Sequence, residues 1–166
     1  MKVDTVFQTS SILSFLLYLK YFTTNQRWGL LKGNANMRAP EDFINNPDAT
    51  ADDVEAANAA GRIVQNDLEN IPFGLVFMWA SALCILGAQV AGKDVESSCL
   101  AHVVLSVIFF TARVLHTVVY SVLKVFVLRA VLFFVGTSAL LGLGIVSMVG
   151  KDEMMAEAVR WNLSSK

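Results

Sequence analysis

Four apolar runs, separated by polar stretches, divide the chain. Each run approaches or exceeds the roughly 20 residues that an α-helix needs to cross a bilayer. The pattern therefore predicts an all-α integral membrane protein, built as a bundle of four transmembrane helices within a single domain. The expected spans cover about residues 5–22, 64–90, 99–123 and 125–150, with an interfacial or frayed helix at 151–166. Residues 23–63 are expected to form a solvated polar loop, in which a short helix through 52–60 is the alternative.

Composition supports a membrane location. The chain is 55% hydrophobic and 16% charged, whereas soluble domains carry about 25% charged residues. The net charge of −1 argues against nucleic acid as a partner. Cys84 and Cys99 lie in or beside apolar runs, without the spacing of a metal site or a disulfide framework, so both are interpreted as packing residues.

The first apolar run is the least pure. Asp4 borders it and Lys20 lies near its end, where the lysine side chain is expected to reach toward the membrane surface. A cleaved signal peptide is the alternative interpretation, disfavoured by Asp4 and by the lack of a small-residue cleavage site. Five basic residues flank each side of the four predicted spans, so charge does not orient the chain.

Polar residues gather at one predicted end of the bundle. In an antiparallel bundle, the start of the second span, the end of the third and the start of the fourth meet at one membrane face. Charged groups inside a membrane cost several kcal/mol on some scales, which makes such a cluster a functional hypothesis. The cluster comprises Arg62, Asn66, Asp67, Glu69, Arg113, His116, Thr117, Tyr120 and Arg129.

The chemistry of this cluster suits a small zwitterion or polycarboxylate. The planar guanidinium groups of Arg113 and Arg129 match carboxylates. Asp67 and Glu69 can accept hydrogen bonds from an ammonium group. The alternative is that Arg62 or Arg113 pairs with Glu69 in internal salt bridges that only join helices. His102, alone among apolar residues, is interpreted as a packing residue.

Several motifs resemble those of one membrane-protein family. They are "RIVQNDLENIPF" at 62–73, "ARVLHTVVY" at 112–120, "RAVLFFVG" at 129–136 and "APED" at 39–42, which is similar to the "NPED" of the family's first loop. Together they resemble the MAPEG superfamily, the membrane-associated proteins of eicosanoid and glutathione metabolism. "NDLEN" and "FFVG" look closest to its microsomal glutathione transferase branch.

The resemblance implies a homotrimer with glutathione as co-substrate, bound at subunit interfaces that face the cytosol, in the endoplasmic reticulum or another cellular membrane. Arg129 occupies the position of the family's arginine beside the glutathione sulfur. The basic contact from the first span can be Arg27 or Lys32. The implied catalytic residues are Arg129 and Asp42, and the implied glutathione-binding residues are Arg27, Arg62, Gln65, Asn66, Glu69, Arg113, His116, Tyr120 and Arg129.

The implied function is that of a glutathione transferase that acts on lipophilic electrophiles. The resemblance allows both conjugation and glutathione-dependent peroxide reduction. A non-catalytic lipid-binding scaffold and a prostaglandin E synthase-like isomerase are the alternatives. Ala130 and Phe133 replace the serine and tyrosine expected for the isomerase. Gln65 stands where the family often has arginine or leucine. A small carrier is disfavoured because the chain shows no internal repeat.

Overall fold

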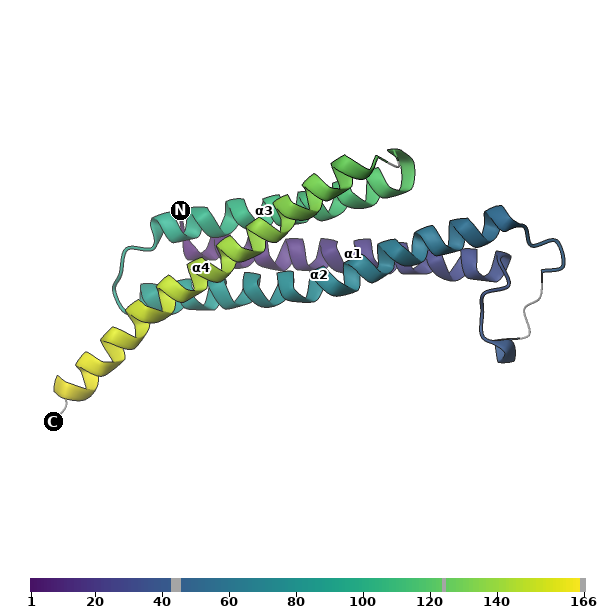
Figure 1. The fold of residues 1–166 in the computed structure, drawn as a ribbon. Helices are drawn as coiled ribbons and strands as arrows, with labels where there is room; N and C mark the ends of the chain where they lie inside the picture. The colour runs from purple at the N-terminus through teal and green to yellow at the C-terminus, as the bar shows by residue number, and fades with distance from the viewer. Residues whose placement is uncertain (43–45, 124, 165–166) are drawn as a thin grey trace.

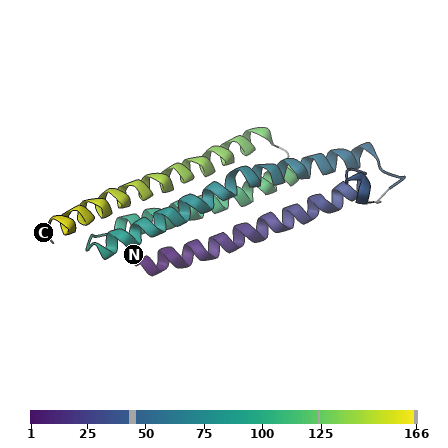
Figure 2. The ribbon, with the colours of Figure 1, turned by 90° about the horizontal axis from the view of Figure 1, so that it is seen from below.

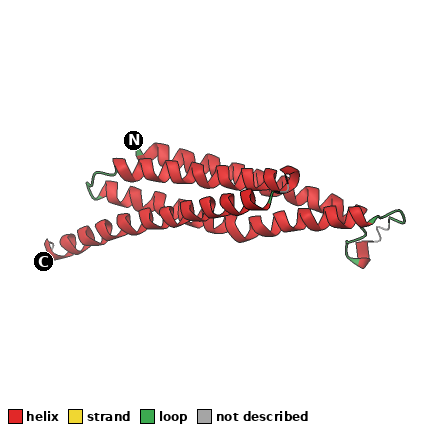
Figure 3. Ribbon diagram, turned by 45° about the horizontal axis from the view of Figure 1, so that its top comes forward, coloured by secondary structure: helices red, strands yellow, loops and turns green. Residues whose placement is uncertain are grey.

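The computed structural model describes residues 1–42, 46–123 and 125–164, and this part of the chain contains helices and no strand. The all-α prediction is therefore confirmed for these residues. Figures 1 and 3 show an elongated bundle in which successive long helices run antiparallel. The elements are α1 (Val3–Asn34), the short 3₁₀ helix η1 (Pro40–Asp42), α2 (Ala51–Val90), α3 (Glu96–Val118), the π-helical segment η2 (Val119–Leu123) and α4 (Phe126–Ser164).

Helix α2 lies at the centre of the contacts. Both α1 and α4 pack along it, and α3 packs mainly on α4 and α1, an arrangement that can be followed in Figure 2. Within the described residues, α2, α3 and α4 are long and apolar enough to cross a membrane. Helix α1 falls short because Gln8, Lys20 and several Ser and Thr residues interrupt its apolar positions. The four-span prediction is thus supported for three helices, with α1 as a fourth long helix of the bundle.

The polar loop predicted at residues 23–63 is much shorter in the structure. Helix α1 continues to Asn34 and α2 already begins at Ala51. The 40 residues of α2 extend roughly 60 Å, about twice the hydrocarbon thickness of a bilayer. Figure 1 shows both helices reaching beyond the turn between α3 and α4.

Packing explains why these polar segments stay helical. Gly61 leaves room for the Trp28 indole, since a Cβ atom there would lie 3.0 Å from Trp28 Nε1. The Lys32 ammonium lies over the same ring, 4.1 Å from its centroid. Trp28 therefore joins the outer part of α1 to α2, and tertiary contact overrides the polar composition.

A capping box begins α2 outside the membrane. The Thr50 hydroxyl accepts a hydrogen bond from the Asp53 backbone N–H at 3.2 Å, and the Asp53 carboxylate accepts one from the Thr50 N–H at 2.9 Å. The Thr50 hydroxyl also donates to the Asp53 carboxylate at 2.6 Å. This bond, together with the one from the Thr50 N–H, holds the pKa of Asp53 below its usual value. The acidic start also complements the positive end of the helix dipole.

His102 joins three helices through two buried serines. Its Nε2 lies 2.9 Å from Ser10 Oγ on α1, and its Nδ1 lies 2.7 Å from Ser81 Oγ on α2. All three side chains have no exposed surface. The expectation of a packing residue is confirmed, and its polar atoms are satisfied inside the protein as a membrane core requires.

Close packing between α2 and α3 depends on Gly74. A Cβ atom added there would overlap the ring of Phe109, which is fully buried in the main apolar cluster. Overpacking of this kind typically costs about 1–3 kcal/mol. Gly74→Ala should therefore lower the apparent melting temperature of the detergent-purified protein.

Gly29→Ala is the matched control for this prediction. It lies within α1, and an added Cβ atom would meet nothing within 4 Å. The substitution should be neutral or stabilise by up to about 1 kcal/mol through helix propensity. Equal melting temperatures for the two variants would contradict the packing argument.

Candidate functional site

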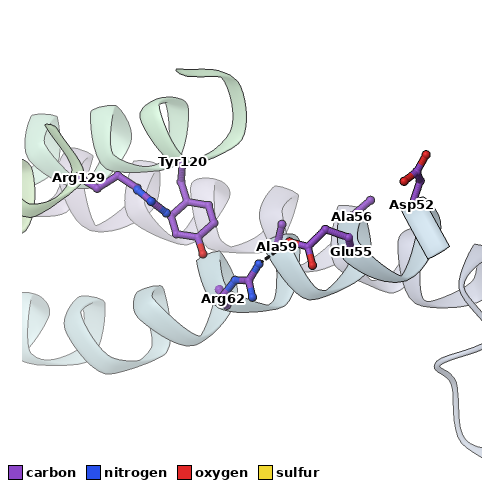
Figure 4. Close-up of a pocket in the computed structure, with 7 residues that line it drawn as sticks. All are labelled: Asp52, Glu55, Ala56, Ala59, Arg62, Tyr120 and Arg129. Atoms are coloured by element: carbon purple, nitrogen blue, oxygen red, sulfur yellow. Dashed lines mark hydrogen bonds and ion pairs between the residues drawn. The ribbon is translucent and has the colours of Figure 1, made fainter. Parts of the chain in front are cut away.

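The first turns of α2 meet the junction between α3 and α4 around one polar pocket, shown in Figure 4. Arg62 comes from α2, Tyr120 from η2 and Arg129 from the first turn of α4. This confirms that the three helix ends named in the sequence pattern come together. The pocket has a volume of about 400 Å³ and is lined by Asp52, Glu55, Ala56, Ala59, Arg62, Tyr120 and Arg129.

Arg129 is held by aromatic rings. Its guanidinium carbon lies 4.6 Å from the centroid of the Tyr120 ring and 5.9 Å from that of Phe126. These cation–π contacts orient the charge without using its N–H donors. Within the described residues, the buried Nε atom of Arg129 has no hydrogen-bond partner. The guanidinium is therefore positioned with donors left to offer a ligand.

An apolar pocket shares two lining residues with the polar pocket. It has a volume of about 350 Å³, and Tyr120 and Arg129 line it as they line the polar pocket. Its remaining lining residues are His116, Phe126, Ala130, Phe133 and Phe134. A polar space and an apolar space thus adjoin at one tyrosine and one arginine.

Tyr120 lies in the π-helical segment η2, between α3 and α4. A π-helix adds a residue to each turn, which rotates the side chains that follow relative to a continuing α-helix, and such segments are frequent at functional sites. The Tyr120 ring also lies near His116, at 6.1 Å between centroids. Tyr120 lines a third space of about 150 Å³ together with Arg27 of α1.

Arg113 lies inside the bundle. It is 1% exposed, and its Nη1 donates to the Asn66 side-chain oxygen at 3.0 Å. Gly136 on α4 makes room for the guanidinium, because a Cβ atom there would lie 3.0 Å from Nη2. Asn66 and Arg113 do not line the pockets described above, so this conformation uses them to join α2 to α3.

Lys20 and Asp67 form a buried ion pair between α1 and α2. The Lys20 ammonium donates to both carboxylate oxygens, one of them at 2.6 Å, and the side chains are only 9% and 2% exposed. The expectation that Lys20 reaches the membrane surface is wrong, because a buried carboxylate at matching depth binds it. Asp67 is consequently occupied and does not lie free to accept a ligand ammonium.

The predicted salt bridges with Glu69 are absent from the described residues. Arg62 instead pairs with Glu55 at 2.8 Å, and both side chains are largely exposed. Glu69 accepts a hydrogen bond from Gln65 one turn earlier on α2, at 3.1 Å. Gln65 and Glu69 are exposed and lie outside the described pockets.

Asp42 lies apart from the pocket residues. It is exposed in η1, which Figure 1 places beside the outer ends of α1 and α2, away from the turn where α3 meets α4. Of the two candidates in the first helix, Arg27 lines a space with Tyr120, whereas Lys32 lies on Trp28.

Asp52 and Glu55 are pocket residues that the sequence pattern assigned to a solvated loop. The available signal was their spacing with Arg62: positions 52, 55, 59 and 62 follow the three- and four-residue steps of one helix face. Among the described residues, no group of three or more His, Cys, Asp or Glu side chains could hold a metal ion. The site is therefore built from arginine, tyrosine and carboxylate chemistry.

The family model that describes the MAPEG family matches residues 10–149, which include every residue that lines these pockets. The protein belongs to the MAPEG family. Membership makes the chain a membrane protein of glutathione and eicosanoid metabolism at the level of the family. No curated protein and no solved structure matches the chain significantly.

The buried pair of Lys20 and Asp67 allows a double-variant test. Lys20→Met leaves a buried carboxylate without its cation, and we expect the free energy of unfolding to fall by roughly 3–5 kcal/mol. Lys20→Met/Asp67→Leu should recover most of this loss, because apolar residues often replace a buried ion pair at little cost. Unfolding by titration with a denaturing detergent measures both. Equal losses in the single and double variants would contradict this account.

Proposed function

We propose that the protein is a membrane-bound glutathione transferase that conjugates glutathione to lipophilic electrophiles. The observation that carries the proposal is the position of Arg129 and Tyr120, which line both a polar and an apolar pocket. A transferase of this kind must bring a charged thiol and an apolar acceptor to one point. Family membership supports the same reading, since the MAPEG family includes glutathione transferases and related isomerases.

Arg129 would stabilise the reacting thiolate. A free thiol with a pKa of about 8.5 is mostly protonated at neutral pH. A guanidinium beside the sulfur favours the anion, and the proton is released to solvent. In conjugation with an aryl halide, the thiolate forms a carbon–sulfur bond and the halide leaves with its electron pair. The cation–π contact with Tyr120 keeps the guanidinium in place without consuming its donors.

The apolar pocket would hold the second substrate. Phe126, Phe133 and Phe134 surround it, and apolar molecules dissolved in the bilayer would reach such a surface readily. The same thiolate could reduce a lipid hydroperoxide, with a second glutathione completing the disulfide. Ala130 and Phe133 lack the hydroxyl groups that the isomerase branch is expected to carry at these positions. We therefore favour conjugation over isomerisation as the reaction.

We further propose a homotrimer, with the site facing the cytosol of the endoplasmic reticulum or another cellular membrane. Gln65 and Glu69 support this assembly, because both are exposed beside the pocket-bearing face of α2. In the trimer, Gln65 and Glu69 would contact glutathione that is bound between two subunits. Asp42, remote within its own chain, would likewise act only across such an interface.

Arg129→Ala should abolish most conjugation activity. We expect kcat to fall roughly 10²- to 10³-fold, the loss typical of removing one preorganised electrostatic contact. Turnover of an aryl halide by detergent-purified protein measures this, and ultraviolet absorbance of the bound thiolate tests the cause directly. Glutathione binding should weaken much less than turnover.

Lys2→Ala serves as the control, since Lys2 is an exposed basic residue at the far end of the bundle. It should retain wild-type turnover. Full activity in Arg129→Ala would remove Arg129 from the mechanism. Glutathione binding by the wild type without turnover of any electrophile or hydroperoxide would favour the lipid-presenting scaffold.

The proposed assembly predicts a mass of three subunits of 18.2 kDa each. Native mass spectrometry of the protein released from detergent measures it. The Arg129→Ala variant should keep the same mass, because the substitution lies at a pocket and leaves the helix bundle intact. A monomer that binds glutathione with full affinity would contradict the interface role of Gln65 and Glu69.

A further inference from the structure

Arg113 carries a charge that the bundle does not neutralise. Its side chain is 1% exposed, and it makes no ion pair among the described residues. Its Nη1 donates to the neutral side chain of Asn66, while the buried Nε and Nη2 atoms have no hydrogen-bond partner in the described part of the chain. A guanidinium stays protonated in proteins, so a full positive charge lies inside the bundle.

The carboxylate that attracts Arg113 is already occupied. Asp67 acts electrostatically on the guanidinium, but both of its oxygens accept hydrogen bonds from Lys20. Lys20 and Arg113 also repel each other. Two cations therefore share one anion, and one positive charge is left without a counter-charge.

Arg113 lies behind the wall of the apolar pocket. Phe133 lines that pocket, and the guanidinium carbon of Arg113 lies 5.8 Å from the centroid of its ring. His116 lines the same pocket and lies within electrostatic range of Arg113, Lys20 and Arg129. The charge therefore faces the pocket through protein of low dielectric constant, where it is screened much less than in water.

Resting on the proposed function, we propose that Arg113 is a positioning residue whose uncompensated charge stabilises the glutathione thiolate through the pocket wall. The thiolate would form where Arg129 and Tyr120 line both the polar and the apolar pocket. Arg129 would contact the sulfur, and Arg113 would act on it across the side chains of Phe133 and His116. The thiol proton goes to solvent, and both guanidinium groups keep their protons throughout.

A purely structural role does not explain the charge. Joining α2 to α3 at this point uses a single N–H donor to Asn66. A neutral amide side chain would supply such a donor, whereas a charge inside a membrane protein is costly. An anion that enters the neighbouring pocket with the substrate gives the buried cation a partner that the described chain does not provide.

The test is a pH titration of glutathione bound to the full chain in detergent, followed by the ultraviolet absorbance of the thiolate. In the wild type, the pKa of the bound thiol should lie below the value of about 8.5 for a free thiol. Arg113→Gln removes the charge and keeps an N–H donor. Because the thiolate loses a favourable charge, the pKa of the bound thiol should rise by about 0.5 to 1 unit.

Turnover of an aryl halide should follow the same titration. Below the pKa of the bound thiol, kcat/KM of Arg113→Gln should fall about 3- to 10-fold, which is the loss of thiolate that this pKa shift produces. Well above both pKa values the thiol is ionised in either protein, so the variant should approach wild-type turnover. A loss of equal size at every pH, with an unchanged thiol pKa, would show a structural role and overturn the proposal.

Asn66→Asp tests the charge without removing the arginine. The new carboxylate would accept the same hydrogen bond from Arg113 and cancel its charge, so the pKa of the bound thiol should rise as in Arg113→Gln. This variant also carries the test if Arg113→Gln does not fold. An unchanged thiol pKa in Asn66→Asp would contradict the proposal.

Lys93→Gln is the matched control, because it also removes one positive charge. Lys93 lies in the turn between α2 and α3, at the end of the bundle away from the pockets. The pKa of the bound thiol should stay at its wild-type value. A shift as large as that of Arg113→Gln would mean that net charge alone is responsible, and the proposal would be overturned.

The two proposals fail in different ways. A wild type that lowers the pKa of the bound thiol, with variants that titrate identically, would overturn the role of Arg113 and leave the transferase proposal standing. A wild type that does not bind glutathione, or binds it without lowering the pKa of its thiol, would overturn both.

Discussion

The arrangement of the bundle depends on how it accommodates charges buried at the level of the membrane. Lys20 and Asp67 neutralise each other between α1 and α2, and Thr24 adds a hydroxyl 3.4 Å from the same carboxylate. Arg113 is equally enclosed, with one bond to Asn66 and two guanidinium nitrogens, Nε and Nη2, that have no partner among the described residues. The cluster thus retains a positive charge in a medium of low dielectric constant. A field of this sign, close to His116 of α3, favours an anion in the neighbouring pocket.

The sequence was sufficient to predict which helix ends meet, because intramembrane polar residues are too costly to be placed at random. It was not sufficient to predict which of them face a ligand. Arg113 and Tyr120 are seven residues apart, a spacing that predicts one shared face of a regular α-helix, yet the arginine is enclosed and the tyrosine lines three spaces. Helical spacing predicts the direction in which a side chain leaves the helix axis, but it does not predict how deeply that side chain is buried. Depth here follows from Gly136, whose missing side chain lets α4 close over Arg113.

The extent of the helices was the least predictable feature, for a related reason. A polar and acidic segment before residue 64 is typical of a loop when each residue is read by its solvation alone. The contact between Trp28 and Gly61 keeps this segment helical instead, because the indole packed on the glycine joins the outer ends of α1 and α2. The extended α2 is also what carries Asp52 and Glu55 to the pocket. One packing contact therefore changes both the fold and the composition of the site.

The junction between α3 and α4 links these features. A continuous α-helix would carry Tyr120 around the axis with its neighbours, whereas the π-helical turn at Val119–Leu123 changes that register just before the chain reverses. Helix α4 then begins at Phe126 and places Arg129 one turn inside, with its guanidinium over the Tyr120 ring. Neither residue would form the shared wall of the two pockets without this irregular turn. Tyr120 and Arg129 lie close together along the chain because residues on either side of a reversal meet at the end of two successive antiparallel helices, which is where both pockets lie.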